Sequence, residues 1–252
     1  MKKTLISIGI AIVAIAIILV SISIIKGKTH KAQNPVATIQ IQGYEKPIKI
    51  ELDPQSAPNA VANFIKLANN GFYTNFKMSI EADRILGDKS MQMARLSNIM
   101  EYPQNDYVYG IKGDFIRNGF DNFIKHEKGV ITMERDDYSY FGYTEEGYNS
   151  ANCNFAILTA NKENYNGNYA AFGKVVDGMD VLEAIAATRV ETSNQDANNA
   201  NTDDTTNKIV ITSISVDTFG VDYGVPETVN YEETINKVNQ LYSQYFGGSA
   251  NQ

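Results

Sequence analysis

The sequence contains no tryptophan, one cysteine and two histidines among its 252 residues. The single cysteine, Cys153, excludes an intramolecular disulfide framework and any metal site built from several cysteines. The two histidines, His30 and His126, are far apart in the sequence, so we expect no zinc cluster and no other metal site. The net charge of −7 argues against nucleic acid as a partner, because phosphate binding needs clustered lysine and arginine.

A long uncharged apolar run occupies residues 5–25, close to the N-terminus. About 20 apolar residues are enough for a helix to span the hydrocarbon core of a bilayer. A cleaved signal peptide is the alternative, but its apolar region is shorter, and no small-x-small cleavage site follows this run. We therefore expect residues 1–25 to form an uncleaved, single-pass anchor in the cell membrane.

Lysines flank both ends of this run, so the positive-inside rule is nearly balanced. Two of them, Lys2 and Lys3, precede the run, and three follow it within the polar tether at residues 26–35. A leader of three residues before a long globular domain usually stays in the cytoplasm. We therefore expect the globular domain to be extracytoplasmic.

Hydrophobic periodicity predicts a β-hairpin and then a helix at the start of the globular domain. Residues 36–42 and 48–52 alternate between apolar and polar side chains, with a turn between them. The following apolar residues recur at the spacing of one helical face: Val61, Phe64, Ile65 and Ala68. This spacing favours an amphipathic helix that begins near Pro58.

Short apolar stretches broken by glycine, asparagine and aspartate run through residues 107–176. Regular turns of this kind are typical of an antiparallel barrel or sandwich. Residues 177–188 then predict a second helix, and residues 208–216 a closing strand. Residues 191–207 are polar and of low complexity, which indicates a solvated loop.

The last residues, 220–252, form an extension beyond the closing strand. Apolar side chains recur at helical spacing between residues 231 and 245. The pattern predicts a short C-terminal helix that packs on the domain or on a partner.

Several blocks of sequence occur in an order that is typical of one family. They are IKIELDPQSAPNAVANFIKLANNGFY, GIKGDFIRNGFDNFIKHEKGVITM, NSANCNFAILTA, GNYAAFGKVVDGMDVLEAIA and KIVITSISV. In this order they resemble the cyclophilin family of peptidyl-prolyl cis/trans isomerases. The resemblance implies a mainly β domain at residues 36–219, with a closed eight-stranded antiparallel barrel capped by two helices. It implies no cofactor, and we expect a monomer.

The family's reaction is rotation about the amide bond that precedes proline. The barrier is about 18–20 kcal/mol, because amide resonance must be broken. No covalent chemistry is needed, since a site that binds the twisted amide more tightly than the planar one lowers this barrier. A guanidinium can donate to the nitrogen lone pair that twisting restores. A side-chain amide can hold the substrate backbone, and apolar walls can hold the proline ring.

The family's pattern places a glutamine eight residues after the arginine of a Phe-His-Arg triplet. Arg84 and Gln92 have this spacing. We predict Arg84 as the catalytic residue and Gln92 as the amide that holds substrate, although Ala82 and Asp83 stand where Phe and His are usual. An alternative alignment without extra residues before the triplet puts Met78 in the place of the arginine.

Other positions of the predicted site also depart from the family pattern. Glu134 follows Met133 where alanine is usual, Asn154 has a shorter amide side chain than the usual glutamine, and Ala156 replaces an aromatic wall of the proline pocket. Phe155 is alternatively a core residue, because strand neighbours alternate between faces. The predicted substrate-binding residues are Met133, Glu134, Asn154, Phe155, Ala156, Tyr165 and Tyr169.

The resemblance therefore predicts a membrane-anchored prolyl isomerase that acts on unfolded, proline-containing chains of exported or surface proteins. The altered pocket positions favour an alternative, a catalytically weakened domain that serves as a peptide-binding module or holdase. The place of Arg84 relative to Met78 distinguishes the two hypotheses.

Overall fold

The computed structural model describes residues 33–80, 84–87, 109–189 and 208–230, and seven positions between 232 and 244. The chain divides into two units, Met1–Gln33 and Asn34–Gln252, and the second unit holds the sheet and helices given below. The predicted anchor and the predicted loop at 191–207 lie outside the described residues. Within the described part of the chain, no helix has the length and apolar character needed to cross a membrane.

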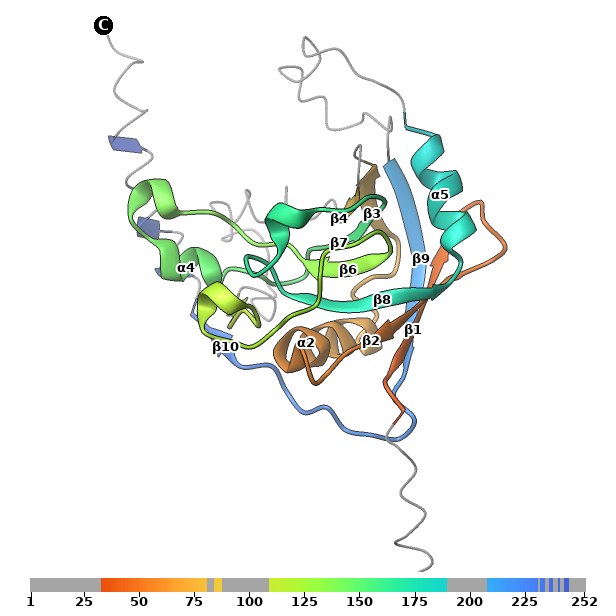
Figure 1. Ribbon diagram of the computed structural model, residues 1–252, viewed down its shortest axis with the longest axis horizontal. Coiled ribbons are helices and arrows are strands. Elements are labelled where there is room, and N and C mark those ends of the chain that lie inside the picture. The colour runs from red at the N-terminus through yellow and green to blue at the C-terminus, as the bar shows by residue number, and fades with distance from the viewer. Residues whose placement is uncertain are drawn as a thin grey trace, which may run out of the picture. The chain divides into compact units, whose positions relative to one another are not determined.

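Eight antiparallel strands form the main sheet (Figure 1). They pair in the order β1-β2-β8-β6-β7-β4-β3-β9, and β9 pairs with β1, so the sheet curls into a barrel. The strands are β1 (Val36–Ile41), β2 (Ile48–Leu52), β3 (Phe76–Ile80), β4 (Arg84–Gly87), β6 (Val130–Met133), β7 (Phe155–Leu158), β8 (Ala171–Asp177) and β9 (Lys208–Asp217). The predicted mainly β, antiparallel fold is confirmed.

The predicted hairpin is strands β1 and β2. Their register runs from Val36 opposite Glu51 to Ile39 opposite Ile48. Alternate side chains of both strands are buried, and the exposed positions of β2 carry charged side chains. The alternation arises because successive strand residues point to opposite faces, of which one covers the core.

Helix α2 (Pro58–Asn69) buries the apolar face that its spacing predicts. Its first N–H groups have no partner within the helix, and a distant side chain satisfies two of them. The Asp114 carboxylate accepts from the backbone N–H groups of Asn59 and Ala60 at 2.8 and 2.9 Å. Burial raises the pKa of Asp114 to about 6, although the two N–H donors act in the opposite direction.

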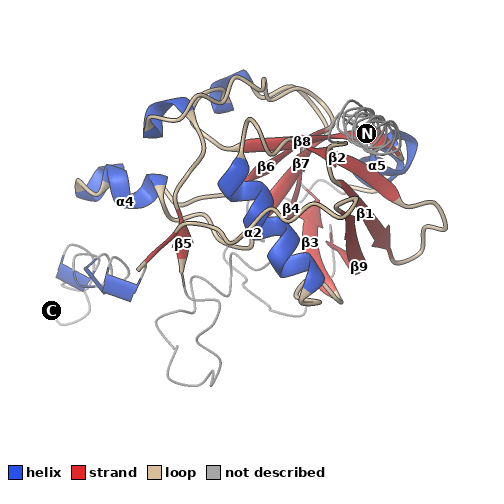
Figure 2. Ribbon diagram, turned by 90° about the horizontal axis from the view of Figure 1, so that it is seen from below, coloured by secondary structure: helices blue, strands red, loops and turns tan. Residues whose placement is uncertain are grey.

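Helix α5 (Met179–Ala187) is the second predicted helix, and it buries Val181, Leu182 and Ile185. Gly178 precedes it with a φ of +85°, and a side chain there would meet the Pro47 carbonyl oxygen at 2.5 Å. Glycine is therefore required at this turn. Figures 1 and 2 show α2 and α5 on different sides of the sheet.

Aromatic rings form the centre of the core. The ring of Phe155 lies 5.5 Å from the rings of both Phe64 and Tyr73. It stacks on the ring of Phe76 at 6.2 Å. The Tyr73 hydroxyl donates to the backbone oxygen of Cys153 at 3.0 Å, which supplies the partner that a buried phenol needs.

The segment after β9 forms one strand of a separate two-stranded sheet. Strand β10 (Thr228–Val229) pairs with β5 (Gly110–Ile111), and the side chain of Asn59 donates to the backbone oxygens of Lys112 and Glu227. Beyond this pairing the backbone is helical at the described positions between 232 and 244. The remaining short helices are η3 (Ile116–Asn118), η4 (Ser139–Phe141), α4 (Thr144–Tyr148) and η5 (Glu163–Tyr165).

Candidate functional site

Three neighbouring strands bring most of the predicted site residues together. The end of β6 bonds to the segments that begin β7 and β8. The Met133 N–H donates to the Ala170 oxygen, and the Glu134 N–H donates to the Asn154 oxygen, both at 3.0 Å. Residues that are 20 and 37 positions apart in the sequence therefore lie side by side.

The strand register separates an inner face from an outer face at this place. Thr132 lies opposite both Ala156 and Ala171, and paired residues of neighbouring strands share a face. The residues between them, Met133 and Phe155, are 2% and 0% exposed and belong to the main core. These two predicted substrate-binding residues therefore point inward and support the outer face from behind.

A pair of stacked tyrosines stands beside this outer face. Tyr165 ends η5, and its ring stacks on the ring of Tyr169 with centroids 4.2 Å apart and planes 24° apart. The Tyr165 ring also meets the imidazole of His126 edge-on at 5.7 Å. Tyr165 is 8% exposed and Tyr169 is half-buried, so the stack presents Tyr169 more than Tyr165 to solvent.

His126 connects this stack to the outer face of β6. Its Nε2 lies 3.0 Å from the Thr132 hydroxyl, and its Nδ1 lies 3.3 Å from the side-chain oxygen of Asn166. Burial lowers the pKa of His126 to about 4, although the contact with Asn166 acts in the opposite direction. The imidazole is therefore neutral at pH 7 and serves as a fixed hydrogen-bonding group.

Asn154 and Glu134 sit at the edge of the outer face, where β7 begins and β6 has ended. Asn154 is 5% exposed, and its side-chain oxygen lies 3.7 Å from the thiol sulfur of Cys153. Glu134 is half-buried and follows Met133 directly. Ala156 is fully buried between its strand partners. Its small side chain therefore forms part of the base of the outer face and does not form an aromatic side wall.

Arg135 was not predicted as a site residue, although it directly follows Glu134. Its guanidinium carbon lies 4.7 Å from the ring centre of Tyr169, 5.0 Å from that of Tyr148 and 5.4 Å from that of Phe115. Its Nε donates to the backbone oxygen of Asn168 at 2.9 Å. The signal available in the sequence was its place two residues after Met133, a predicted site residue.

The two candidates for the catalytic position lie on different strands. Met78 is on β3, is 1% exposed and belongs to the main core. Arg84 begins β4, and its backbone pairs with Leu158 of β7. The register also places Leu86 opposite Ala156. Gln92 lies outside the described residues.

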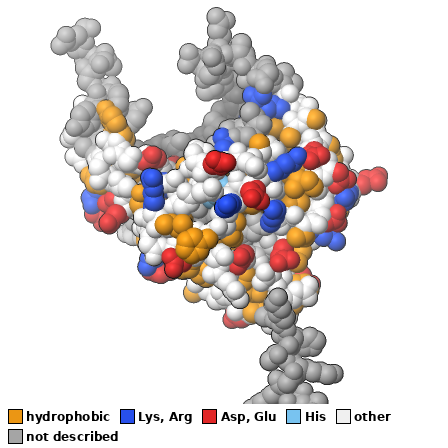
Figure 3. All heavy atoms as spheres, in the orientation of Figure 1, with side chains coloured by type: hydrophobic (Ala, Val, Ile, Leu, Met, Phe, Trp, Pro, Cys, Tyr) orange, Lys and Arg blue, Asp and Glu red, His pale blue; other side chains and the backbone are white. Residues whose placement is uncertain are grey.

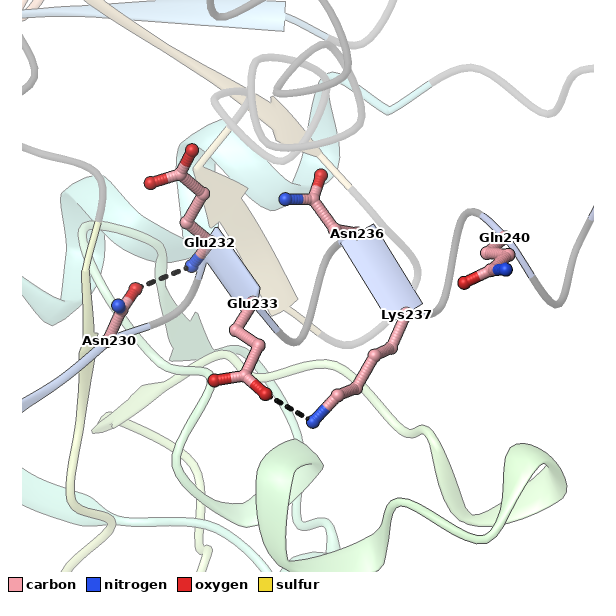
Figure 4. Close-up of a pocket in the computed structure, with 6 residues that line it drawn as sticks. All are labelled: Asn230, Glu232, Glu233, Asn236, Lys237 and Gln240. Atoms are coloured by element: carbon pink, nitrogen blue, oxygen red, sulfur yellow. Dashed lines mark hydrogen bonds and ion pairs between the residues drawn. The ribbon is translucent and has the colours of Figure 1, made fainter.

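Hollows of other composition lie elsewhere in the described part of the chain. One, of about 300 Å³, is lined only by polar side chains of residues 230–240. Figure 4 shows Glu233 and Lys237 of this hollow paired at 2.6 Å. Figure 3 shows acidic and basic side chains interspersed over one face of the molecule. That face carries no concentration of basic charge of the kind that phosphate binding needs.

The low pKa of His126 is expected to make the free energy of unfolding depend on pH in the acid range. Its pKa is 6.5 in the unfolded chain and about 4 in the fold, so protons bind the unfolded state preferentially as pH falls through this window. This difference removes up to about 3 kcal/mol of unfolding free energy by pH 4. Asp114, whose folded pKa is raised to about 6, contributes with the opposite sign between pH 6 and 4.

The variant His126→Gln should therefore lose less unfolding free energy than the wild type between pH 7 and pH 4. Urea unfolding curves at pH 4, 5, 6 and 7 measure the difference. Asp114→Asn is the opposing control, because it should lose more than the wild type over the same range. Equal pH dependence in His126→Gln and wild type would contradict the assignment.

The family model described as cyclophilin type peptidyl-prolyl cis-trans isomerase/CLD matches residues 36–216. The chain is 28% identical over 144 residues to peptidyl-prolyl cis-trans isomerase A of Dickeya dadantii, covering 57% of this chain and 68% of that protein. It is 27% identical over 176 residues to a probable peptidyl-prolyl cis-trans isomerase of Brucella suis, covering 66% and 79%. These relatives share the predicted activity at low identity.

Solved structures support the same fold. A Cryptosporidium parvum cyclophilin type peptidyl-prolyl cis-trans isomerase, crystallised in the presence of the dipeptide Ala-Pro, aligns with a TM-score of 0.51. The alignment covers 72% of this chain and 98% of that one, at 19% identity. This structural match shows the fold, and the family model over residues 36–216 shows that the chain belongs to the family of cyclophilin-type peptidyl-prolyl cis-trans isomerases.

Proposed function

We propose that this isomerase acts at the outer surface of the cell membrane, on X-Pro bonds of exported or surface chains that have not yet folded. The apolar run at residues 5–25 supports a membrane anchor, since it is long enough to span a bilayer and carries no charge. The Cryptosporidium parvum structure was determined in the presence of the dipeptide Ala-Pro, which supports a proline-containing peptide as substrate.

The substrate lies on the outer face where β6, β7 and β8 meet. The observation that carries this placement is the pair of backbone bonds from Met133 to Ala170 and from Glu134 to Asn154. They fix a shared edge beside the stacked rings of Tyr165 and Tyr169. The proline ring packs against this aromatic wall, because a flat apolar surface suits a small saturated ring.

The amide of Asn154 holds the substrate backbone at this edge. Its side chain is nearly buried and sits at the start of β7, so little rotational freedom is lost on binding. The neighbouring Glu134 adds a carboxylate at the rim, where it favours substrates with a basic residue near the proline.

Arg84 is the catalytic cation of this proposal. Strand positions two apart share a face, so the pairings of Arg84 with Leu158 and of Leu86 with Ala156 support an outward position for residue 84. Met78, which takes the place of the arginine in the alternative alignment, is buried among core residues and does not line the outer face. The guanidinium donates to the prolyl nitrogen when the amide is twisted, which stabilises the transition state more than the planar substrate.

A proline-limited refolding assay with the full chain in detergent micelles tests the activity. The uncatalysed phase lasts tens of seconds, so acceleration is easy to measure. We expect the slow phase to shorten in proportion to enzyme concentration. Suppressed aggregation without any acceleration would instead favour the alternative role as a holdase.

The membrane placement has a separate test. Cells that express the full chain are treated with an external protease that cannot cross the membrane. We expect the globular domain to be digested and the chain to remain with the membrane after alkaline carbonate extraction. Protection of the domain in intact cells would overturn the extracytoplasmic placement, and release by carbonate would overturn the anchor.

A further inference from the structure

The aromatic wall beside the site is held by a cation that the predicted site did not include. Arg135 contacts the ring of Tyr169 at 4.7 Å from its centre, and the rings of Tyr148 and Phe115 lie within 5.4 Å. A guanidinium among three aromatic rings is stabilised by cation–π attraction, which is stronger where water is partly excluded. Arg135 is half-buried, so this condition is met.

The hydrogen bonds of Arg135 go to backbone carbonyl oxygens. Its Nε donates to Asn168 and its Nη1 donates to Asp136, both at 2.9 Å. The acceptor at Asn168 directly precedes Tyr169 in the chain. One planar group therefore fixes the backbone before Tyr169 and covers the ring of Tyr169.

Tyr169 in turn contacts the other residues of the aromatic wall. Tyr169 stacks on Tyr165 at 4.2 Å, and Tyr165 meets His126, whose imidazole lies 3.0 Å from the Thr132 hydroxyl on the outer face of β6. The wall is thus fixed at one end by His126 and at the other end by Arg135. Because Ala156 provides no aromatic ring of its own, the wall depends on this stack.

We propose that Arg135 is a positioning residue for the substrate groove, which sets the orientation of Tyr169 and thereby the fit of the residue at the proline position. This inference rests on the proposed placement of substrate against Tyr165 and Tyr169. Lysine cannot replace arginine here, because an ammonium group lacks the planar fork that bonds two carbonyls while a ring stacks on its face.

The test compares Arg135→Leu and Arg135→Lys with the wild-type full chain in an isomerase assay on a short X-Pro peptide. We expect both variants to lose about tenfold or more in kcat/KM, mainly through a higher KM. Arg117→Leu is the matched control, because Arg117 is exposed on η3, and it should keep wild-type kcat/KM. Wild-type kinetics in Arg135→Leu would overturn the proposal.

A second measurement separates positioning from a general loss of structure. In a Tyr169→Ala background, Arg135→Leu should cause little further loss of kcat/KM, because the arginine acts through that ring. Independent losses that multiply would overturn the proposed route through Tyr169.

A third measurement does not depend on catalysis. The chain has no tryptophan, so Tyr169→Trp introduces one fluorescent reporter into the wall. Adding Arg135→Leu should increase its quenching by acrylamide, since the indole would no longer be held. Unchanged quenching would overturn the positioning role. A wild-type chain without isomerase activity would instead contradict the proposed function, and the fluorescence result would still report on Arg135.

Discussion

Arg84→Ala is expected to lower kcat/KM for X-Pro isomerisation by about hundredfold, the loss typical when one preorganised donor to a transition state is removed. The planar substrate has little basicity at the prolyl nitrogen, because its lone pair is delocalised into the carbonyl. Donation from the guanidinium therefore becomes strong only as the amide twists. The loss should appear in kcat, with KM changed far less.

Two variants make this expectation specific. Arg84→Lys keeps the positive charge without the planar donor array, and we expect it to recover only a small part of the rate. Arg117→Ala removes an exposed arginine on η3 and should leave kcat and KM unchanged. If Arg84→Ala retained wild-type kcat while the wild-type chain was active, another group would have to act on the prolyl nitrogen.

Local patterns predicted the parts of the fold that depend on one segment at a time. The hairpin β1–β2 and the buried faces of α2 and α5 follow from alternation and helical spacing within a few residues. These elements cover the core on one face only, so their sequences carry a clear periodic signal.

The sequences of strands β6 and β7 did not indicate which of their residues face the site. All four residues of each strand are buried, because the main core covers one face and a small cluster of Val130, Leu158 and Ala171 lies on the other. A strand whose residues are all buried shows no clear alternation of apolar and polar side chains, so its sequence does not indicate which residues face inward. The inward placement of Met133 and Phe155 therefore became visible only through the strand register.

The features that the sequence did not predict depend on contacts between segments that are distant in the chain. The cap of α2 comes from Asp114, which lies 54 and 55 positions from its partners, and Arg135 meets rings from three other segments. No local pattern encodes such pairings, because they depend on how the strands are ordered. The resemblance to a family supplied the order of the sequence blocks, but the contacts of Arg135 with the rings of Phe115, Tyr148 and Tyr169 became visible only in the fold.

Phe155→Ala is expected to cost the largest amount of stability, about 3–5 kcal/mol of unfolding free energy, as for other buried aromatic residues truncated to alanine. The side chain has no exposure, and its ring contacts those of Phe64, Tyr73 and Phe76. Truncation leaves a cavity that these rings cannot fill without moving. Urea unfolding measures the loss.

The same variant also decides between the two interpretations of Phe155. As a core residue facing away from substrate, it should leave KM near the wild-type value once rates are corrected for the folded fraction. Phe123→Ala is the matched control, because Phe123 is 72% exposed, and it should change stability by less than about 0.5 kcal/mol. A several-fold rise of KM in fully folded Phe155→Ala would place its ring against the substrate, because a cavity behind the sheet alone does not remove a substrate contact.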